Sequence, residues 1–462
     1  MAVSTIRSTS PQAPGDVIVE VGATSVEDVA RRAARARAAQ AEWAAGTALG
    51  RADALSAAAQ AVFAAREELA GLVCREVGKP LSEATVEVAR TIAILRFYAQ
   101  QALAMDGETY PGNGPAGTLV LARGRPYGLA TLVTPWNFPV MIPTWKAAPA
   151  LAYGNAVLLK PAPAATGCAL RLGELIAPAL PDGLLQVIPG GPDTGQAALE
   201  AGDLISFTGS TEVGRMIVTE AHATGIPVQA EMGGLNASIV LPDADPAGAA
   251  SVIAAAAMGY AGQKCTATSR VIVVGENADF TDALVAAVRA LPVGDPQGLQ
   301  TVVGPVISEA ARTAVLAAGG RSRDEGGSVL TGGGTSDPGW YVEPIVVGGL
   351  DAGSWAAQNE VFGPFCVLLS ARSVDDAIAA ANGTPYGLCT SVFTSDLDQV
   401  LALPGRLRTG MVRINAATTG VDFHTPFGGF GESGHGDREL GTGARRFYTQ
   451  EQTVTIQPRL PS

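Results

Sequence analysis

The sequence predicts an α/β protein built from two domains, each with a parallel sheet covered by helices. Its 462 residues are enough for two or three domains at roughly 100–200 residues each. Hydrophobic residues make up 47% and charged residues 16% of the chain, which indicates a large buried interior and excludes a disordered chain. Short apolar runs alternate with segments of helical length in two successive regions, and this alternation is typical of doubly wound sheets.

The N-terminal region predicts two surface helices. Thr24, Ser25, Val26 and Glu27 form a capping-box pattern, so the first helix is expected to begin there and to run to about residue 45. The second is expected over about residues 51–77. Both segments are rich in alanine, glutamate and arginine and carry one apolar stripe.

The first alternation of strands and helices begins after Gly128. Its apolar runs predict strands over residues 129–134, 156–159, 184–188, 204–207, 228–231 and 238–241. The segments between these runs predict helices, among them residues 142–152, 166–177 and 212–223.

The second alternation follows Pro242. It predicts strands over residues 270–274, 342–347, 365–369, 391–394 and 411–414, and helices over residues 247–259, 279–290, 309–318 and 374–381. The residues 319–339 are rich in glycine, serine and aspartate and predict a long surface turn region. Residues 446–457 alternate apolar and polar side chains, as a strand does.

The composition excludes several classes of protein. A net charge of −12 without a basic run argues against a nucleic-acid partner. The five cysteines are odd in number and widely spaced, so neither a disulfide framework nor a zinc site is expected, and three histidines offer little for any other metal site. The N-terminus has no apolar signal segment, and the longest apolar stretch, residues 247–261, is shorter than the ~20 residues of a membrane span. A cytoplasmic protein without membrane contact is therefore expected.

Polar residues stand at the predicted carboxyl ends of strands, where open parallel sheets bind their ligands. Asn137 follows the first strand, Lys160 caps the second and Glu231 ends a third. Another strand leads into Gly209, Ser210 and a helix start, whose free N–H groups favour a phosphate group. The full G-x-G-x-x-G fingerprint is absent, and an ordinary helix cap at Ser210 fits this segment equally well.

Cys265 is the cysteine whose surroundings suggest reactivity. It lies among glycine, small and polar residues in the segment 262–268, which indicates an accessible turn or helix start. Backbone N–H dipoles and Lys264 would stabilise a thiolate at such a position. The cysteines that fall in predicted apolar strands or a helix, and are expected to be buried and inert, are Cys168, Cys366 and Cys389.

Six motifs, taken together, resemble those of the aldehyde dehydrogenase superfamily. They are residues 134–139 (TPWNFP), 207–214 (FTGSTEVG), 231–234 (EMGG), 262–266 (GQKCT), 359–364 (NEVFGP) and 426–429 (PFGG). The resemblance implies a Rossmann-like cofactor domain over residues 1–106 and 128–233 and a second α/β catalytic domain over 234–429. It also implies a small β oligomerisation arm from residues 107–127 and 430–462, and hence a homodimer or homotetramer.

The resemblance implies oxidation of a small-molecule aldehyde to a carboxylic acid with NAD+ or NADP+. Cys265 matches the family nucleophile, which forms a thiohemiacetal and then a thioester. The Asn137 amide and the backbone N–H of Cys265 match the donors to the oxyanion, and Glu231 matches the base that activates the hydrolytic water. Lys146 and Glu439 match a proton-relay pair, with one extra residue in the loop before Glu439. A capping or ion-pair role is the alternative for Glu231.

Other matched residues belong to the cofactor site. Lys160 and Glu360 match the residues that hold the two riboses, and Phe362 matches the residue against the nicotinamide. A solvated strand end and ordinary core packing are the alternatives for Lys160 and Phe362. Further matches in the same cleft are Trp136, Gly209, Ser210 and Gly233. Pro163 stands where many NAD+-preferring members carry a ribose-binding glutamate, so NADP+ is expected to be tolerated.

The residues expected to line the substrate tunnel are mostly apolar and suit an aliphatic or aromatic aldehyde: Phe138, Met141, Ile142, Trp145, Lys264, Thr266 and Phe427. The nearest sub-resemblance is to α-ketoglutarate semialdehyde dehydrogenase-like members, and residues 262–270, 421–424 and 447–449 carry it. Two rival functions remain. CoA-acylating members usually lack a glutamate at the Glu231 position. A non-catalytic structural protein on the same fold would be favoured by loss of the nucleophile, base or oxyanion donor, and all three are present.

Overall fold

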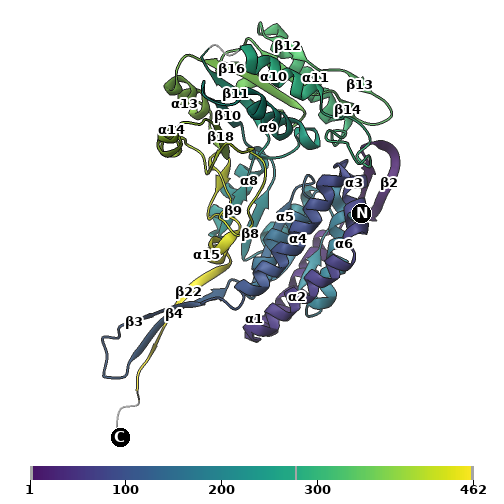
Figure 1. Ribbon diagram of the computed structural model, residues 1–462. Coiled ribbons are helices and arrows are strands. Elements are labelled where there is room, and N and C mark those ends of the chain that lie inside the picture. Colours follow the sequence, from purple (N-terminus) through teal and green to yellow (C-terminus); the bar gives the residue numbers. More distant parts are fainter. Residues whose placement is uncertain (1–3, 276–277, 459–462) are drawn as a thin grey trace.

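The computed structural model describes residues 4–275 and 278–458, which form two α/β bodies and a slender β arm (Figure 1). The first body contains the N-terminal helices, and the second, drawn in green, contains the middle of the chain. The α/β prediction with two mainly parallel sheets is confirmed.

The first sheet has the strand order β21-β9-β8-β5-β6-β7 and is parallel except for β21. Its strands are β5 (Leu129–Thr134), β6 (Ala156–Pro161), β7 (Leu185–Val187), β8 (Leu204–Thr208), β9 (Val228–Glu231) and β21 (Gly434–His435). The helices of this body are α1 (Val26–Ala45), α2 (Ala48–Ala64), α3 (Arg66–Val77), α4 (Leu81–Gln101), α5 (Met141–Ala152), α6 (Thr166–Ile176), α7 (Pro192–Ala201) and α8 (Thr211–Thr224). The central strands are buried on both faces, which explains why they form continuous apolar runs in the sequence.

A hairpin of β1 (Thr5–Ser10) and β2 (Ala13–Gly22) precedes these helices and was not predicted. The inward-facing residues of β1 are Ile6, Ser8 and Ser10. Two of these three buried positions hold serine, so the strand lacks the apolar alternation by which a strand is predicted. Helix α4 also has no counterpart in the prediction.

Helix α1 begins one residue later than a capping box starting at Thr24 predicts. Ser25 is the N-cap, and its Oγ accepts a hydrogen bond from Asp28 N at 3.1 Å. Thr24 is engaged elsewhere, because its N–H donates to the carbonyl of Pro189 and its own carbonyl accepts from Thr194 Oγ1.

The single helix predicted over residues 51–77 is wrong, because the chain breaks at Ala65 into α2 and α3. The apolar stripe keeps its spacing from Val62 to Leu69 across the break, so the pattern alone does not reveal it. Arg66 occupies the intervening position of the stripe, and its exposed guanidinium donates to the carbonyl of Phe63 at 3.1 Å. A charged side chain therefore interrupts the buried face where the helix ends.

The second sheet has the order β12-β15-β16-β11-β10-β18-β19, and only β12 is antiparallel. Its strands are β10 (Asn236–Val240), β11 (Thr268–Val274), β12 (Ser328–Thr331), β15 (Ile345–Gly348), β16 (Phe365–Ala371), β18 (Cys389–Phe393) and β19 (Met411–Ile414). Helices α9 (Pro246–Met258), α10 (Ala278–Arg289), α11 (Glu309–Asp324), α12 (Trp355–Gln358), α13 (Val374–Asn382) and α14 (Leu397–Ala402) belong to this body. Two short pairs are β13 (Thr335–Ser336) with β14 (Tyr341–Val342), and β17 (Tyr386–Gly387) with β20 (Phe430–Gly431).

Two predictions for the second body are wrong. The strand predicted over residues 342–347 is split into β14 and β15 around Pro344, which has no N–H to donate to a ladder. The turn region predicted over 319–339 instead contains the end of α11 and the edge strand β12. Helix α11 continues because Gly319 and Ser322 extend its buried face, and tertiary packing overrides the low helix propensity of glycine.

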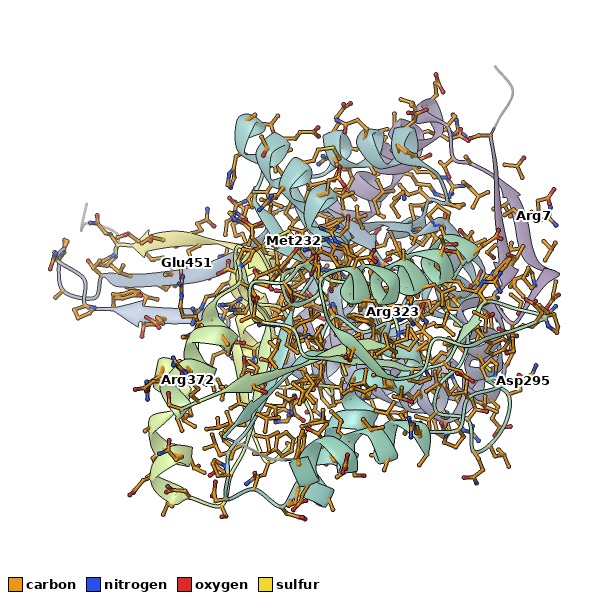
Figure 2. The ribbon with its side chains drawn as sticks, turned by 90° about the horizontal axis from the view of Figure 1, so that it is seen from above. Arg7, Met232, Asp295, Arg323, Arg372 and Glu451 are labelled. Atoms are coloured by element: carbon orange, nitrogen blue, oxygen red, sulfur yellow. The ribbon has the colours of Figure 1, made fainter. Side chains whose placement is uncertain are left out.

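The arm is a three-stranded antiparallel sheet of β3 (Gly107–Tyr110), β4 (Leu119–Pro126) and β22 (Thr449–Ile456), with β4 in the centre. Seen from above, Glu451 lies out on this arm, whereas Met232 lies near the middle of the molecule (Figure 2). The first residues of the strand predicted over 446–457 belong instead to the short helix α15 (Ala444–Tyr448).

The C-terminal segment is shared among the parts of the molecule. Residues 430–462 were predicted to belong to the arm. Instead, β20 pairs with β17, and β21 pairs with β9 of the first sheet. Within the described part of this segment, only β22 joins the arm. The exact domain boundaries stay a prediction, but this segment does not form one arm element. No helix within residues 4–275 and 278–458 is long and apolar enough to cross a membrane.

Candidate active site

The polar residues predicted at strand ends lie at one edge of the first sheet. Lys160 stands beside Val133 in the β5–β6 ladder, and Phe207 stands beside Val133 on the other side. Thr208 pairs with Glu231 in the β8–β9 ladder. The aligned register explains how residues far apart in the sequence reach the same edge.

Cys265 comes from the second body, in the loop between the short helix η3 (Gly259–Gly262) and β11. Three successive residues of this turn have φ angles of 54°, 52° and 65°, and the third is Gly262. A β-carbon on Gly262 would lie 2.1 Å from the carbonyl oxygen of Gly363, so glycine is required by space as well as by conformation. The turn presents a half-buried thiol, in agreement with the predicted accessible turn.

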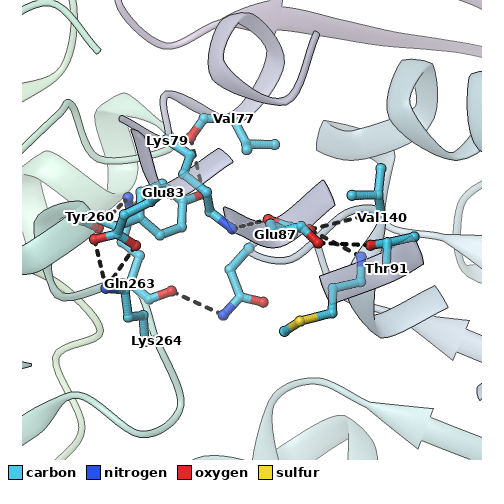
Figure 3. A network of polar contacts seen from close by, with 11 residues as sticks. Val77, Lys79, Glu83, Glu87, Thr91, Val140, Tyr260, Gln263 and Lys264 are labelled. Atoms are coloured by element: carbon cyan, nitrogen blue, oxygen red, sulfur yellow. Dashed lines mark hydrogen bonds and ion pairs between the residues drawn. The ribbon is translucent and has the colours of Figure 1, made fainter. Parts of the chain in front are cut away.

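A network of polar contacts joins the Cys265 loop to the first body (Figure 3). The buried Asn137 donates through Nδ2 to the carbonyl of Gln263 at 3.0 Å. The Gln263 side chain donates to the carbonyls of Tyr260 and Pro305 at 3.3 and 3.2 Å and accepts from Ile307 N at 2.8 Å. The loop before the cysteine is therefore held on both sides.

The surroundings of Cys265 disfavour a thiolate, contrary to the prediction from its neighbours. Burial raises the pKa of the thiol above its ordinary value. The carboxylates whose charges raise this pKa further are Glu231, Glu360 and Glu439. Lys264 does not offset them, because its Nζ lies 2.8 Å from Glu83 in an ion pair. The expected support of a thiolate by Lys264 is thus wrong.

Glu231 is 3% exposed, and burial together with the charge of Glu439 raises its pKa well above the ordinary value. The motif at residues 426–429 closes over this carboxylate. A β-carbon on Gly428 would lie 2.6 Å from Glu231 Oε1, so the motif needs glycine at this point. The result is a carboxyl group that stays protonated at unusually high pH.

Lys146 and Glu439, predicted as a pair, form a fully buried ion pair. Lys146 Nζ also donates to Ser206 Oγ at 2.8 Å and to the carbonyl of Phe207 at 3.2 Å. Burial lowers the pKa of Lys146 and raises that of Glu439. Two backbone hydrogen bonds between Glu439 and Phe427, of 2.7 and 2.8 Å, hold the backbone of Glu439 in place.

A cavity of about 370 Å³ opens beside Cys265. All of the predicted tunnel residues line it: Phe138, Met141, Ile142, Trp145, Lys264, Thr266 and Phe427. The prediction missed one face of α4 and a loop of the second body, which contribute Ser82, Glu83, Val86, Glu87, Arg90, Thr419, Gly420 and Val421. A helical pattern was available there, because Glu83, Glu87 and Arg90 are spaced by four and three residues and share a helix face.

Lys79 and Glu87 form a second fully buried ion pair, beneath the start of α5 (Figure 3). Glu87 Oε1 accepts hydrogen bonds from the backbone N–H groups of Val140 and Met141, both at 3.1 Å. Lys79 Nζ lies 3.7 Å from the ring centroid of Phe138. This pair therefore holds both the helix start and the loop before it.

The predicted cofactor residues include aromatic and acidic side chains. Trp136 and Phe362 pack edge to face with centroids 5.7 Å apart, and Phe362 has a φ of 51° that is uncommon for a bulky residue. Glu360 accepts from the backbone N–H of Gly234 at 3.1 Å, and burial raises its pKa to about 7. A β-carbon on Gly233 would lie 2.2 Å from Glu360 Oε2, which explains the glycine.

The neighbouring groups fit a dinucleotide. Lys160 is half-buried at the end of β6, and within the described part of the chain it forms no ion pair. Ser210 caps α8, with its Oγ accepting from Val213 N, and Gly209 precedes it in the tight turn. A cation, a helix N-terminus and a carboxylate acceptor suit phosphate and ribose groups. Pro163 begins the turn after β6, so no carboxylate stands at that position.

Comparison with known proteins agrees with this site. The sequence model described as the Aldehyde dehydrogenase family matches residues 2–454. The chain is 36% identical to the alpha-ketoglutaric semialdehyde dehydrogenase of Bacillus subtilis, covering 98% of this chain and 95% of that protein. It is 37% identical to the alpha-ketoglutarate semialdehyde dehydrogenase of Haloferax volcanii, with coverage of 97% and 95%.

Solved structures are also similar. The NAD-dependent aldehyde dehydrogenase of Sinorhizobium meliloti has a TM-score of 0.95 and 33% identity, over 99% of this chain and 92% of that one. Betaine aldehyde dehydrogenase of Staphylococcus aureus, solved in complex with NAD+, has a TM-score of 0.94 and 30% identity, over 99% and 93%. The fold and the matches together define an oxidoreductase with a Rossmann-like sheet. The chain belongs to the aldehyde dehydrogenase family, and as an NAD-dependent enzyme it oxidises an aldehyde to a carboxylic acid.

Proposed function

We propose that this aldehyde oxidation proceeds through a thioester on Cys265, which water then hydrolyses with Glu231 as the base. The observation that carries the proposal is the buried carboxyl group of Glu231, whose raised pKa matches a proton acceptor and whose charge acts on the Cys265 thiol. The cavity beside the thiol supplies the space for the aldehyde.

The first half of the reaction needs a proton acceptor for the thiol. When ionised Glu231 takes the proton from Cys265, the carboxylate charge that disfavours a thiolate disappears. The sulfur then bonds to the aldehyde carbon, and the carbonyl electrons move to the oxygen. Loss of a hydride from that carbon restores the C=O bond and leaves a thioester.

Asn137 is suited to stabilise the oxygen while it carries negative charge. Its amide has two N–H donors, and one of them binds the carbonyl of Gln263. The other donor and the backbone N–H of Cys265 are the proposed partners of the oxyanion. Because Gln263 is itself fixed, the Asn137 donor needs little reorganisation during the reaction.

Hydrolysis requires Glu231 to act a second time. The proton it carries must leave before it can take another from water, and the Lys146–Glu439 pair offers a buried route for that proton. Water that has lost its proton to Glu231 attacks the thioester carbon, the C–S bond breaks, and the departing thiolate takes that proton back from Glu231 to become the thiol. We propose Lys146 and Glu439 as this relay.

The cofactor cleft would hold NAD+ through Lys160 and Glu360 at the riboses, Ser210 at the pyrophosphate and Phe362 at the nicotinamide. Within it, Trp136, Gly209 and Gly233 shape the walls. When bound, the nicotinamide ring accepts the hydride. Pro163 supports tolerance of NADP+, because no carboxylate there repels a 2′-phosphate.

The names of the Bacillus and Haloferax relatives support a semialdehyde substrate, in line with the sub-resemblance in the sequence. The mostly apolar cavity also suits simple aliphatic or aromatic aldehydes. Steady-state reduction of NAD+ and NADP+ across an aldehyde panel, with and without CoA, tests the proposal. Acid as the product without CoA is expected; acyl-CoA formation with CoA-dependent turnover would identify the acylating alternative.

We further propose that the arm mediates assembly into a homodimer or homotetramer. Large apolar side chains on all three of its strands are about half exposed: Tyr110, Leu119 and Ile456. The outer edge of β22 is unpaired among the described residues and can accept another strand. The cytoplasmic location expected from the sequence stays a prediction.

A further inference from the structure

The cavity beside Cys265 is mostly apolar, and three of the four charged residues in its lining are already neutralised by ion pairs. Glu83 pairs with Lys264, so the charges of these two lining residues cancel. Glu87 pairs with Lys79, whose side chain is fully buried. The remaining charged group of the lining is Arg90.

Arg90 is half-buried on the same face of α4 and forms no ion pair with any residue in the described ranges. Its Nη1 donates to the carbonyl of Val421 at 2.6 Å, and a guanidinium offers five N–H donors in all. The cavity wall therefore carries one positive charge that no carboxylate of the described chain balances. Planar guanidinium groups bind carboxylates in a two-pronged geometry.

The spacing along α4 separates this charge from the reacting thiol. Cys265 follows Lys264, which is bound to Glu83, and Arg90 lies seven residues beyond Glu83. At 1.5 Å per residue, that is about 10 Å along the helix axis, over which the flexible arginine side chain can adjust. An aldehyde held at the thiol would direct the far end of its carbon chain toward Arg90.

We propose that Arg90 binds a carboxylate at the end of the substrate remote from the aldehyde, so that the enzyme prefers semialdehydes of dicarboxylic acids to neutral aldehydes. This assignment rests on the proposed function of Cys265 and deepens it by naming the residue that selects the substrate. The ion pairs on the other lining residues explain why the acidic groups in the wall do not repel such an anion.

Arg413 provides a matched control. It donates through Nη2 to the carbonyl of Gly420 at 2.6 Å, so it holds the same loop as Arg90 does. It lines a neighbouring cavity with Asp422 and Thr425 instead of the cavity that contains Cys265. Loss of Arg413 removes a similar support from the loop without removing charge from the Cys265 cavity.

The decisive measurement compares 5-oxopentanoate with pentanal, which has the same chain length without the charge, as substrates of the wild type, Arg90→Gln and Arg413→Gln. The ratio of kcat/KM for the two aldehydes should fall roughly 10- to 100-fold in Arg90→Gln, the range expected for loss of a charged hydrogen bond. In Arg413→Gln the ratio should stay at the wild-type value. A proportional loss for both aldehydes in Arg90→Gln, or an unchanged ratio, would show that Arg90 only supports the loop.

A second readout does not depend on turnover. Glutarate should slow alkylation of Cys265 by iodoacetamide in the wild type, measured by mass spectrometry on the Cys265 peptide, and should slow it several-fold less in Arg90→Gln. Equal protection of the two proteins, or none, overturns the assignment of Arg90. If the wild type turns over neither aldehyde while glutarate protects as expected, the proposed chemistry at Cys265 has failed and the anion site stands.

Discussion

Cys265 shares its surroundings with acidic groups, and such a thiol stays protonated until a base removes its proton. In the proposed reaction, Glu231 is that base, and it also accepts a proton from water during hydrolysis. One residue therefore links the two halves of the reaction. Lys264 is next to Cys265 in the sequence, but it forms an ion pair with Glu83. It is therefore not the group that promotes ionisation of the Cys265 thiol.

Replacing Cys265 with alanine should abolish aldehyde-dependent NADH formation while leaving NAD+ binding largely intact. The thiol makes the covalent bond, whereas the proposed cofactor contacts come mainly from the strand ends of the first sheet. Activity assays and isothermal titration with NAD+ would be compared with those of Cys366→Ala, a buried cysteine in the core of the second body. Substantial turnover by the Cys265 variant would disprove the nucleophile.

Replacing Glu231 with glutamine should stop the enzyme after hydride transfer. The amide keeps the shape of the carboxylic acid but cannot accept a proton from water. Stopped-flow traces should show a burst of about one NADH per active site followed by slow turnover, with an acyl mass increment on Cys265. Unchanged steady-state turnover would point to another base, and added CoA should restore little activity in a hydrolytic enzyme.

Glu360 should make the stability of the fold depend on pH. Burial raises its pKa from the ordinary 4.5 to about 7, so between these pH values the folded chain binds more protons at this position than the unfolded chain. Its contribution to stability is therefore full below about pH 4.5 and is lost as the pH rises through about 7. Urea unfolding at several pH values should show a smaller decline over this range for Glu360→Gln than for the wild type. Identical pH slopes would contradict the assigned shift.

At the scale of elements, α5 depends on a charge supplied by another helix. Glu87 of α4 accepts from the first N–H groups of α5 and neutralises buried Lys79. The loop that carries Asn137 directly precedes these N–H groups. The position of the proposed oxyanion donor is thus tied to the packing of α4 on α5.

Replacing Glu87 with glutamine should cost about 3–5 kcal/mol of unfolding free energy, because a buried lysine loses its counter-charge. Chemical denaturation would measure this loss. Glu67→Gln breaks the exposed pair with Arg66 and should cost less than about 1 kcal/mol. Similar losses in the two variants would mean that the buried pair contributes no more than a surface pair.

The elements that could be predicted from the sequence are those whose burial leaves a periodic apolar pattern. Strands β5, β9 and β19 begin and end at the predicted residues. The hairpin of β1 and β2 could not be found this way, since serines face inward there. The break between α2 and α3 could not be predicted for the opposite reason, because the stripe of apolar residues continues through it.

The residues of the candidate site were predictable by type and position, whereas their ionisation was not. Lys146 and Glu439 are 293 residues apart, and the resemblance to the family alone joined them. The partner of Lys264 depends on the placement of α4, a helix that the sequence analysis does not predict. Electrostatic surroundings are a property of tertiary packing, so they required the structure.

For the whole molecule, assembly through the arm predicts association at micromolar concentration. Light scattering should give the mass of a dimer or tetramer. Ile456→Glu, which places charge on the exposed apolar surface of β22, should shift the population toward monomer, whereas Glu451→Gln on the same strand should not. A wild type that remains monomeric at these concentrations would argue against the arm as an interface.

The distribution of the C-terminal segment over the molecule has a consequence for synthesis. Strands β21 and β22 and the carboxylate of Glu439 are made late relative to their partners, because each completes a structure begun hundreds of residues earlier. A growing chain can fold its N-terminal helices and most of its first sheet while Lys146 still lacks its counter-charge. The proposed proton relay beside Glu231 can therefore form only after Glu439 has been synthesised, and a chain that stops before this residue would carry a folded cofactor region without the relay.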